Sequence, residues 1–314
     1  MSQPIVAIYI STADDETPPQ FNDDYYASAY KYLCEKLIKG GADAVCVYDA
    51  ERNYSKNGVF RQGWRAVLDK NGIHFQKFSE PIKVDILFDK NNFPFDDLLM
   101  INSRLVYEIT HDKYTSYLFA PDFHAKSYLL RNKNDLDTFK LAYNTQHVAL
   151  KELDGNGGDE VFVGRIANYD DSLEYPLFAQ EFVDTSGGFK NLAQGVHDVR
   201  VRLFNGEVLG GILREPTKSG ELRTNLHLGG KLRVLSNDEL PSELIEKTHA
   251  LDQRFSSSEP RFFSADWGFD KNTKEWRLFE LNNAPGLNDP ATDGTEAAKY
   301  LDDIARKLIE SAQR

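Results

Sequence analysis

Two acidic residues and one amide near the C-terminus have a spacing that could hold a metal ion. Asp266 precedes Glu280 and Asn282, and the last two stand two positions apart at the end of 276–281, an expected strand. Side chains two apart on a strand project to one face, so their oxygens would point the same way. Hard cations such as Mg2+ prefer oxygen ligands. Solvated acidic residues at strand ends would show the same spacing.

A second set of residues is cationic and suits a polyphosphate. Lys113 precedes the middle of the chain, and Lys151 ends an expected strand just before the loop Asp-Gly-Asn-Gly-Gly at 154–158. The backbone amides of such a loop could close over phosphate oxygens. The alternative is a surface hairpin with a glycine tip and a solvated lysine at its base.

The segment Arg-Thr-Asn-Leu-His-Leu-Gly-Gly at 223–230 combines an arginine fork, an amide and paired glycines. These groups can hold a phosphate and a developing negative charge, as acyl-phosphate chemistry requires. His227 lies between two leucines, which favours a packed structural residue over a catalytic base. We therefore assign it no proton transfer.

The elements that must position these residues change character along the chain. The first hundred residues predict a small, doubly wound parallel α/β domain, with strands at 5–10, 44–49 and 83–88. A helix with apolar residues at helical spacing follows the first strand and ends at Gly40 and Gly41. No glycine-rich phosphate loop follows the first strand, which argues against dinucleotide binding there.

The remainder predicts α plus antiparallel β structure. A helical segment at 103–119 precedes a hairpin of 147–151 with 160–163, and another strand is expected at 177–183. The segments 196–204 and 207–215 should pair across Asn205-Gly206, a strong hairpin turn. The chain ends in an amphipathic helix at 295–314 with Tyr300, Leu301, Ile304 and Leu308 on one side.

The composition limits the kinds of ligand and partner that the protein is expected to bind. The 314 residues carry a formal net charge of -12, which disfavours nucleic acid as the main ligand but leaves room for a local basic cleft that binds small anions. Two cysteines, Cys34 and Cys46, provide no disulfide framework or cysteine metal site and are expected to pack in the core. The N-terminus lacks a signal-peptide pattern and no apolar run approaches a membrane span, so we expect a cytoplasmic protein without membrane partners.

Taken in order, these motifs resemble the ATP-grasp superfamily, and most closely its RimK-type and glutathione-synthetase-like carboxylate–amine ligases. The resemblance covers roughly residues 100 to 290. Its most specific parts are R-T-N-L-H-L-G-G and F-E-L-N-N-A-P-G-L, which are similar to the family signatures R-S-N-x-x-x-G-G and E-x-N-x-x-P-G. Gln180-Glu181-Phe182-Val183 and Asp198-Val199-Arg200 complete the pattern.

The resemblance implies an ATP-grasp fold of α/β and α+β class, in which two α+β lobes enclose the nucleotide. An N-terminal parallel α/β (pre-ATP-grasp) domain would cover 1–102, a central lobe with the glycine loop 103–183, and a C-terminal lobe with the magnesium site 184–314. The implied metal is Mg2+, with Mn2+ as an alternative, held by Asp266, Glu280 and Asn282. Arg200 and Arg223 would steady the acyl phosphate. The implied ATP-binding residues are Lys113, Lys151, Gly155, Asn156, Gly157, Gly158, Glu181, Phe182, Val183, Asp198, Arg223, Thr224 and Asn225.

The implied reaction joins a carboxylate to an amine through an acyl phosphate and releases ADP and phosphate. A phosphotransferase that forms no amide, and a nucleotide-binding regulatory protein without turnover, are the alternatives. The segments 184–198 and 270–275 are longer than in the compact RimK-type pattern, and the N-terminal domain shows no substrate-reading motif. The acid and the amine, expected to be an amino acid, a peptide or a protein terminus, are therefore not specified. A homo-oligomer is expected from the resemblance alone.

Overall fold

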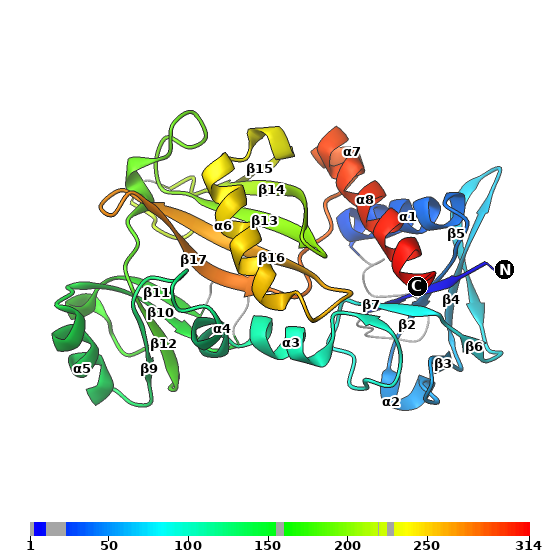
Figure 1. The fold of residues 1–314 in the computed structure, drawn as a ribbon, viewed down its shortest axis with the longest axis horizontal. Helices are drawn as coiled ribbons and strands as arrows, with labels where there is room; N and C mark the ends of the chain where they lie inside the picture. The colour runs from blue at the N-terminus through cyan, green and yellow to red at the C-terminus, as the bar shows by residue number, and fades with distance from the viewer. Residues whose placement is uncertain (1–2, 11–22, 155–159, 219, 225–228) are drawn as a thin grey trace.

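The structure is a computed structural model that describes residues 3–10, 23–154, 160–218, 220–224 and 229–314. Its strands form three large sheets, one in each of three successive parts of the chain, and a small two-stranded sheet (Figure 1). Among the described helices, none is long and apolar enough to cross a membrane.

The first sheet has the order β5-β4-β2-β1-β7-β8. Its central strands β1 (Ile5–Tyr9), β2 (Asp43–Val47) and β7 (Ile86–Asp89) pair in parallel, as the sequence predicted, and β8 (Met100–Ile101), which was not predicted, pairs in parallel with β7. Helix α1 (Asp24–Lys39) starts where the Asp23 side chain accepts hydrogen bonds from two backbone amides, and it ends at Gly40. Both cysteines are fully buried here, as expected.

The edge of this sheet differs from the expectation of purely parallel strands. The hairpin of β4 (Gly63–Asp69) and β5 (Gly72–Phe78) joins β2 in antiparallel orientation. Most of its residues are half-exposed, so the apolar periodicity that marks a buried strand is weak there. The short helix α2 (Ala50–Asn53) and the strand pair β3 (Val59–Phe60) and β6 (Ile82–Lys83) lie at the same end.

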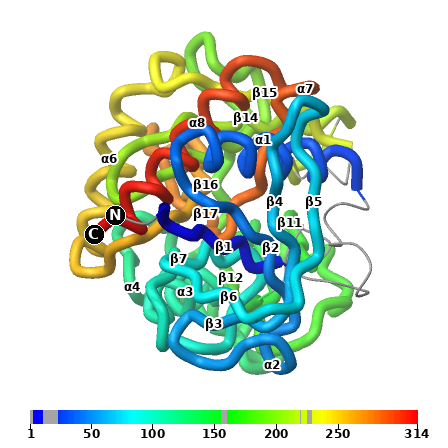
Figure 2. Tube along the Cα trace, turned by 90° about the vertical axis from the view of Figure 1, so that its right-hand side faces the viewer, coloured from blue at the N-terminus to red at the C-terminus, as the bar shows by residue number. Residues whose placement is uncertain are grey.

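The last helix returns to the first domain. Helix α8 (Thr295–Ala312), which follows the short α7 (Pro290–Asp293), lies beside α1 in both views (Figures 1 and 2). Its residues Tyr300, Leu301, Ile304 and Leu308 are buried in one core with α1 and β1, which confirms the predicted apolar side. The C-terminal helix thus packs in the core of the N-terminal domain. The predicted domain boundaries remain a prediction.

The central sheet is antiparallel, with the order β11-β10-β12-β9. It consists of β9 (Ser127–Leu130), β10 (His147–Glu152), β11 (Val161–Arg165) and β12 (Leu177–Glu181), with α5 (Asn134–Tyr143) packed on it. The predicted hairpin of β10 and β11 is confirmed. The predicted helical segment before it is divided into α3 (Arg104–His111) and α4 (Lys113–Phe119), because the Asp112 side chain caps a new helix.

The third sheet has the order β15-β14-β13-β16-β17. Its strands are β13 (Asp198–Phe204), β14 (Glu207–Glu215), β15 (Lys231–Leu235), β16 (Phe262–Asp270) and β17 (Glu275–Asn282), and α6 (Ser242–Asp252) belongs to the same core. The hairpin of β13 and β14 turns at Asn205 and Gly206, whose φ angles of 47° and 82° suit the predicted turn.

Asn102 connects the first sheet to the third. It is buried, and its Nδ2 donates to the carbonyls of Phe262 at 2.7 Å and Asn283 at 2.9 Å. Its Oδ1 accepts from the amide of Phe262 at 2.6 Å. One side chain therefore satisfies backbone groups on both sides of the metal-ligand segment predicted at 266–282.

We expect Asn102→Ala to lower the free energy of unfolding by about 2–4 kcal/mol, because it leaves buried backbone groups without partners. Urea denaturation of the full chain would measure the loss. Asn91→Ala, at an exposed position of the same domain, is the control and should change little. Equal stability of the two variants would contradict the assigned role.

Candidate functional site

A cavity lies between the central sheet and the third sheet. Strands β10, β11 and β12 contribute one wall, strands β13, β14, β16 and β17 the other, and residues 181–185 lie where the chain passes between them. The predicted site residues that line it are Lys113, Lys151, Glu181, Phe182, Val183, Asp198, Arg223, Thr224, Asp266 and Glu280. The structure thus gathers into one space residues that are far apart in sequence.

The part of the cavity near the chain crossing is largely apolar. Ala149, Val161 and Val163 line it from the central sheet, and Phe182 and Val183 follow the end of β12. A planar apolar group with polar edges fits such a wall, since backbone groups at a strand end can bond to its edges.

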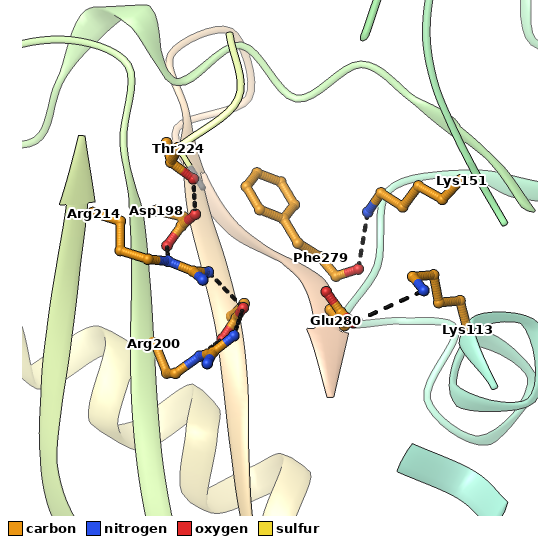
Figure 3. Close-up of polar contacts among 9 residues, drawn as sticks. Lys113, Lys151, Asp198, Arg200, Arg214, Thr224, Phe279 and Glu280 are labelled. Carbon is orange, nitrogen blue, oxygen red and sulfur yellow. Dashed lines mark hydrogen bonds and ion pairs between the residues drawn. The ribbon is translucent and has the colours of Figure 1, made fainter. Parts of the chain in front are cut away.

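The two predicted lysines lie near the carboxylate of Glu280 (Figure 3). Lys113, the first residue of α4, places its Nζ 3.9 Å from Oε1 of Glu280. Nζ of Lys151 donates to Oε1 of Gln180 at 3.2 Å and to the carbonyl of Phe279 at 3.1 Å. Gln180 is buried and also donates to the carbonyl of Leu278, so it fixes Lys151 against β17.

The surroundings lower the pKa of Lys151 to about 8. Burial is the largest cause; Glu280 opposes it, and the charge of Lys113 adds to it. This lysine therefore changes charge close to neutral pH, and an anion bound beside it would favour the charged form.

A one-residue irregularity brings two consecutive residues of β17 into the cavity. Asp266 pairs with Glu280, but the next residue, Trp267, pairs with Leu278, so Phe279 is the extra residue of a bulge. Phe279 and Glu280 both line the cavity, which regular alternation would prevent. Gly268 makes this possible, because a Cβ there would lie 2.2 Å from the ring of Phe279.

Two arginines and two aspartates form a continuous charged chain across the third sheet (Figure 3). Arg200 donates from Nε and Nη2 to the two oxygens of Asp266, both at 2.7 Å. Arg214 donates to Asp266 at 2.6 Å and to Asp198 at 2.6 Å. Thr224 donates its hydroxyl to the other oxygen of Asp198.

Arg214 lines the cavity and was missed by the sequence analysis. A regular two-residue hairpin at Asn205-Gly206 would place Arg214 opposite His197, on the other face from Asp198. The structure pairs Arg214 with Asp198 instead, because the register shifts by one residue between Val201 and Leu203. The paired glycines of β14 were the only sequence signal for that shift.

Asp266 stays negatively charged in this setting. Burial alone would raise its pKa, but the guanidiniums of Arg200 and Arg214 outweigh that effect and hold the pKa well below the usual range. Arg200 therefore lies against the predicted metal ligand. Arg223, the other predicted catalytic arginine, lines the cavity and binds Glu221 through two hydrogen bonds at 3.0 and 3.1 Å.

Two of the three predicted metal ligands, Asp266 and Glu280, line the cavity, whereas Asn282 is not among the lining residues. Glu280 is a cross-strand neighbour of Asp266, and Asn282 follows two residues later on the same strand. The Asp266 oxygens already accept three hydrogen bonds, whereas 28% of the Glu280 side chain is exposed. The described residues contain no group of three His, Cys, Asp or Glu side chains that could hold a metal. Two carboxylates and one amide nevertheless fit a hard cation that completes its shell with phosphate and water.

Some predicted residues lie outside the described part of the chain. These are Gly155, Asn156, Gly157, Gly158 and Asn225, together with His227.

Comparison with protein families agrees with this geometry. Residues 122–305 match the model of the RimK-like ATP-grasp domain. A glutathione synthetase of Anaplasma centrale is 30% identical over 182 residues, which are 51% of this chain and 55% of that protein. A coenzyme γ-F420-2:α-L-glutamate ligase of Methanocaldococcus jannaschii is 31% identical over 196 residues, 60% of this chain and 61% of that protein. The match thus spans little more than half of each relative.

A solved structure resembles the whole chain. The ATP-grasp ligase PsnB, in complex with a phosphomimetic variant of its minimal precursor, Mg and ADP, gives a TM-score of 0.61 at 11% identity and covers 99% of this chain and 100% of that chain. This likeness shows an ATP-grasp fold, as the sequence predicted. Because the family model matches more than half of the sequence, the chain belongs to the RimK-like ATP-grasp family.

Proposed function

We propose that the chain is an ATP-dependent carboxylate–amine ligase. The observation that carries this proposal is the cavity itself, which has apolar walls at one side and places Lys113 and Lys151 beside the carboxylates of Asp266 and Glu280 at the other. That division matches a nucleotide with its base in the apolar part and its phosphates between the lysines and the acidic residues.

The chain's own residues would divide the work as follows. The backbone of Glu181, Phe182 and Val183 would bind the adenine edge, and Lys113 and Lys151 would bind the phosphates. Asp266, Glu280 and Asn282 would hold magnesium, or manganese in its place, which neutralises phosphate charge when bound. Lysines and a metal ion suffice here, since phosphoryl transfer needs positioning and charge neutralisation more than a covalent catalyst.

The proposed reaction has two steps. A carboxylate oxygen of the acid attacks the γ-phosphorus of ATP, the bond to the bridging oxygen breaks, and ADP leaves. An amine nitrogen then attacks the acyl carbon, inorganic phosphate leaves, and the nitrogen loses a proton as the amide forms. Arg223, which lines the cavity, would stabilise the charge that develops on the acyl phosphate, and Arg200 would support it by orienting Asp266.

The family also suggests the class of substrate. The two relatives are named a glutathione synthetase and a glutamate ligase, and PsnB has been solved in complex with a precursor peptide. We therefore propose an amino acid, a peptide or a protein terminus as substrate. A cytoplasmic location suits the two unpaired buried cysteines, and a homo-oligomer is proposed from the family alone.

The decisive experiment measures ADP and phosphate release from ATP and Mg2+ with amino acids and short peptides, supplied singly and in pairs. Pair-dependent release, with a product lighter by one water than the two substrates combined, would establish the ligase. Release that depends on the acid alone, with a phosphorylated product in the mass spectrum, would show a phosphotransferase and overturn the proposal.

Glu280→Gln should reduce ADP release by at least about 100-fold, because it removes one of two carboxylates that would stabilise the metal–phosphate complex. Coupled-enzyme kinetics would measure it, and circular dichroism would check that the variant is folded. Glu275→Gln, at the exposed start of the same strand, is the matched control and should retain activity. Similar rates in both variants would refute the assignment of Glu280.

The affinity for ATP should fall as the pH rises through about 8. Above its lowered pKa of about 8, Lys151 loses its proton and no longer binds a phosphate as a cation. The affinity for ATP should then fall by up to about tenfold per pH unit. Calorimetric titrations between about pH 7.5 and 9.5 would show the decline, at pH values where the ATP phosphates are already ionised. Lys151→Arg keeps its charge over that range, so its affinity should stay flat; a wild-type profile equally flat would remove Lys151 from the phosphate site.

A further inference from the structure

A second row of polar side chains lies beside the row that contains the proposed metal ligands. Arg202, Ser264 and Asn282 are in register across β13, β16 and β17. They stand two residues beyond Arg200, Asp266 and Glu280 on the same three strands. Both rows therefore project to the same face of the sheet, about 7 Å apart.

Arg202 is a buried cation without a carboxylate partner among the described residues. Its exposed fraction is 0%, its Nη1 donates to Oδ1 of Asn288 at 2.7 Å, and its guanidinium lies 3.6 Å from the ring centre of Tyr300. Its Nε and Nη2 have no hydrogen-bond partner in the described part of the chain. Because a buried charge is costly unless it is paired, this arrangement favours the binding of an anionic group beside Arg202.

The other two members of the row also have unused polar atoms. The hydroxyl of Ser264 and Nδ2 of Asn282 are buried and lack partners within the described ranges. Lys90, at the end of β7, reaches the same region and donates to the carbonyl of Pro285 at 2.6 Å, three residues after Asn282. The groups gathered here are thus mostly hydrogen-bond donors.

The fold also makes room for the Arg202 side chain. Gly210 occupies the irregular part of β14 opposite Arg202, with a φ of 89°. A Cβ at this position would lie 3.3 Å from Nη2 of Arg202 and 2.8 Å from the carbonyl of Leu235. The guanidinium of Arg202 therefore occupies space that exists only because position 210 has no side chain.

We propose that Arg202, the hydroxyl of Ser264 and Nδ2 of Asn282 bind a carboxylate of the acid substrate, so that the substrate carries two carboxylates joined by a short chain. Oδ1 of Asn282 stays available to the metal ion. This inference rests on the proposed function, because one carboxylate would occupy the Arg202 row while the other reaches the phosphate at the Glu280 row. Arg200 and Glu280 stand next to this row on the same strands, and their side chains are 18% and 28% exposed. The unpaired donors supply the bonds that a carboxylate accepts.

A comparison of two buried arginines tests whether Arg202 serves the fold or a ligand. Arg261 is 3% exposed and binds both oxygens of Asp252, at 2.9 and 2.5 Å. Arg261→Met should lower the melting temperature clearly, since it leaves Asp252 buried without its partner. Arg202→Met removes an unpaired charge and keeps apolar volume, so its melting temperature should be unchanged or higher. A fall as large as that of Arg261→Met would make Arg202 structural and overturn the proposal.

Binding to the full chain gives the second readout. With saturating ADP and Mg2+, calorimetry should show that glutarate binds at least tenfold more tightly than its monoamide, glutaramate, and that Arg202→Met removes this preference. Equal binding of the two compounds, or no binding of glutarate, would overturn the proposal. Loss of inorganic phosphate binding in Arg202→Met without any glutarate preference would show an anion site unrelated to the acid substrate, which also overturns it.

The nucleotide separates this inference from the proposed function. If ADP and Mg2+ bind to both wild type and Arg202→Met but neither protein prefers glutarate over glutaramate, the carboxylate site is refuted and the ligase proposal is not. A wild-type chain that binds neither ADP nor ATP would refute the ligase itself.

Discussion

The charged chain Asp198–Arg214–Asp266–Arg200 is the interaction on which the rest of the site depends. Buried carboxylates are stable only when donors satisfy them. Here Asp266 accepts from Arg200 on the neighbouring strand β13 and from Arg214 on β14, and Asp198 accepts from Arg214 and Thr224. These four charged side chains link β13, β14 and β16, and the two guanidiniums keep Asp266 ionised at the cavity edge. Once Asp266 is fixed, its cross-strand partner Glu280 faces Lys113 of α4 and Lys151 of the central sheet.

Two irregularities in otherwise regular strands produce this geometry. The bulge at Phe279 places two successive side chains in the cavity and presents the Phe279 carbonyl to Lys151. The shift near Gly210 places Arg214 on the face of Asp198 and leaves space for Arg202. A one-residue shift reverses the face of every later side chain, so each irregularity decides which residues can meet. Gly268 and Gly210 allow them because a Cβ would collide with neighbouring atoms.

The sequence predicted the parts of the fold that depend on local patterns. The central parallel strands, the turn at Asn205-Gly206 and the apolar side of the last helix follow from periodicity and turn chemistry, and all are confirmed. The residues gathered in the cavity were identified through the order of their motifs. Two features were missed. The hairpin of β4 and β5 is half-exposed, so its apolar periodicity is weak, and the place of Arg214 in the cavity depends on a register shift that spacing along one strand does not show. The packing of α8 on α1 is a long-range contact with no local signal.

Several cationic side chains gather at the site although the whole protein is acidic. The chain carries a net charge of -12, yet Lys113, Lys151, Arg200 and Arg214 surround the cavity and its edge, and Arg202 and Lys90 lie beyond them. The cavity is also lined by the acidic residues Glu181, Asp184, Asp198, Asp266 and Glu280, and arginines are bonded to Asp198 and Asp266. The burial of Arg202 without a carboxylate partner among the described residues costs free energy, which a bound carboxylate would offset by supplying the opposite charge. Lys113 and Lys151 contact Glu280 and Phe279 of β17 and are also the proposed phosphate ligands, so nucleotide binding should stabilise the contact between these lysines and β17.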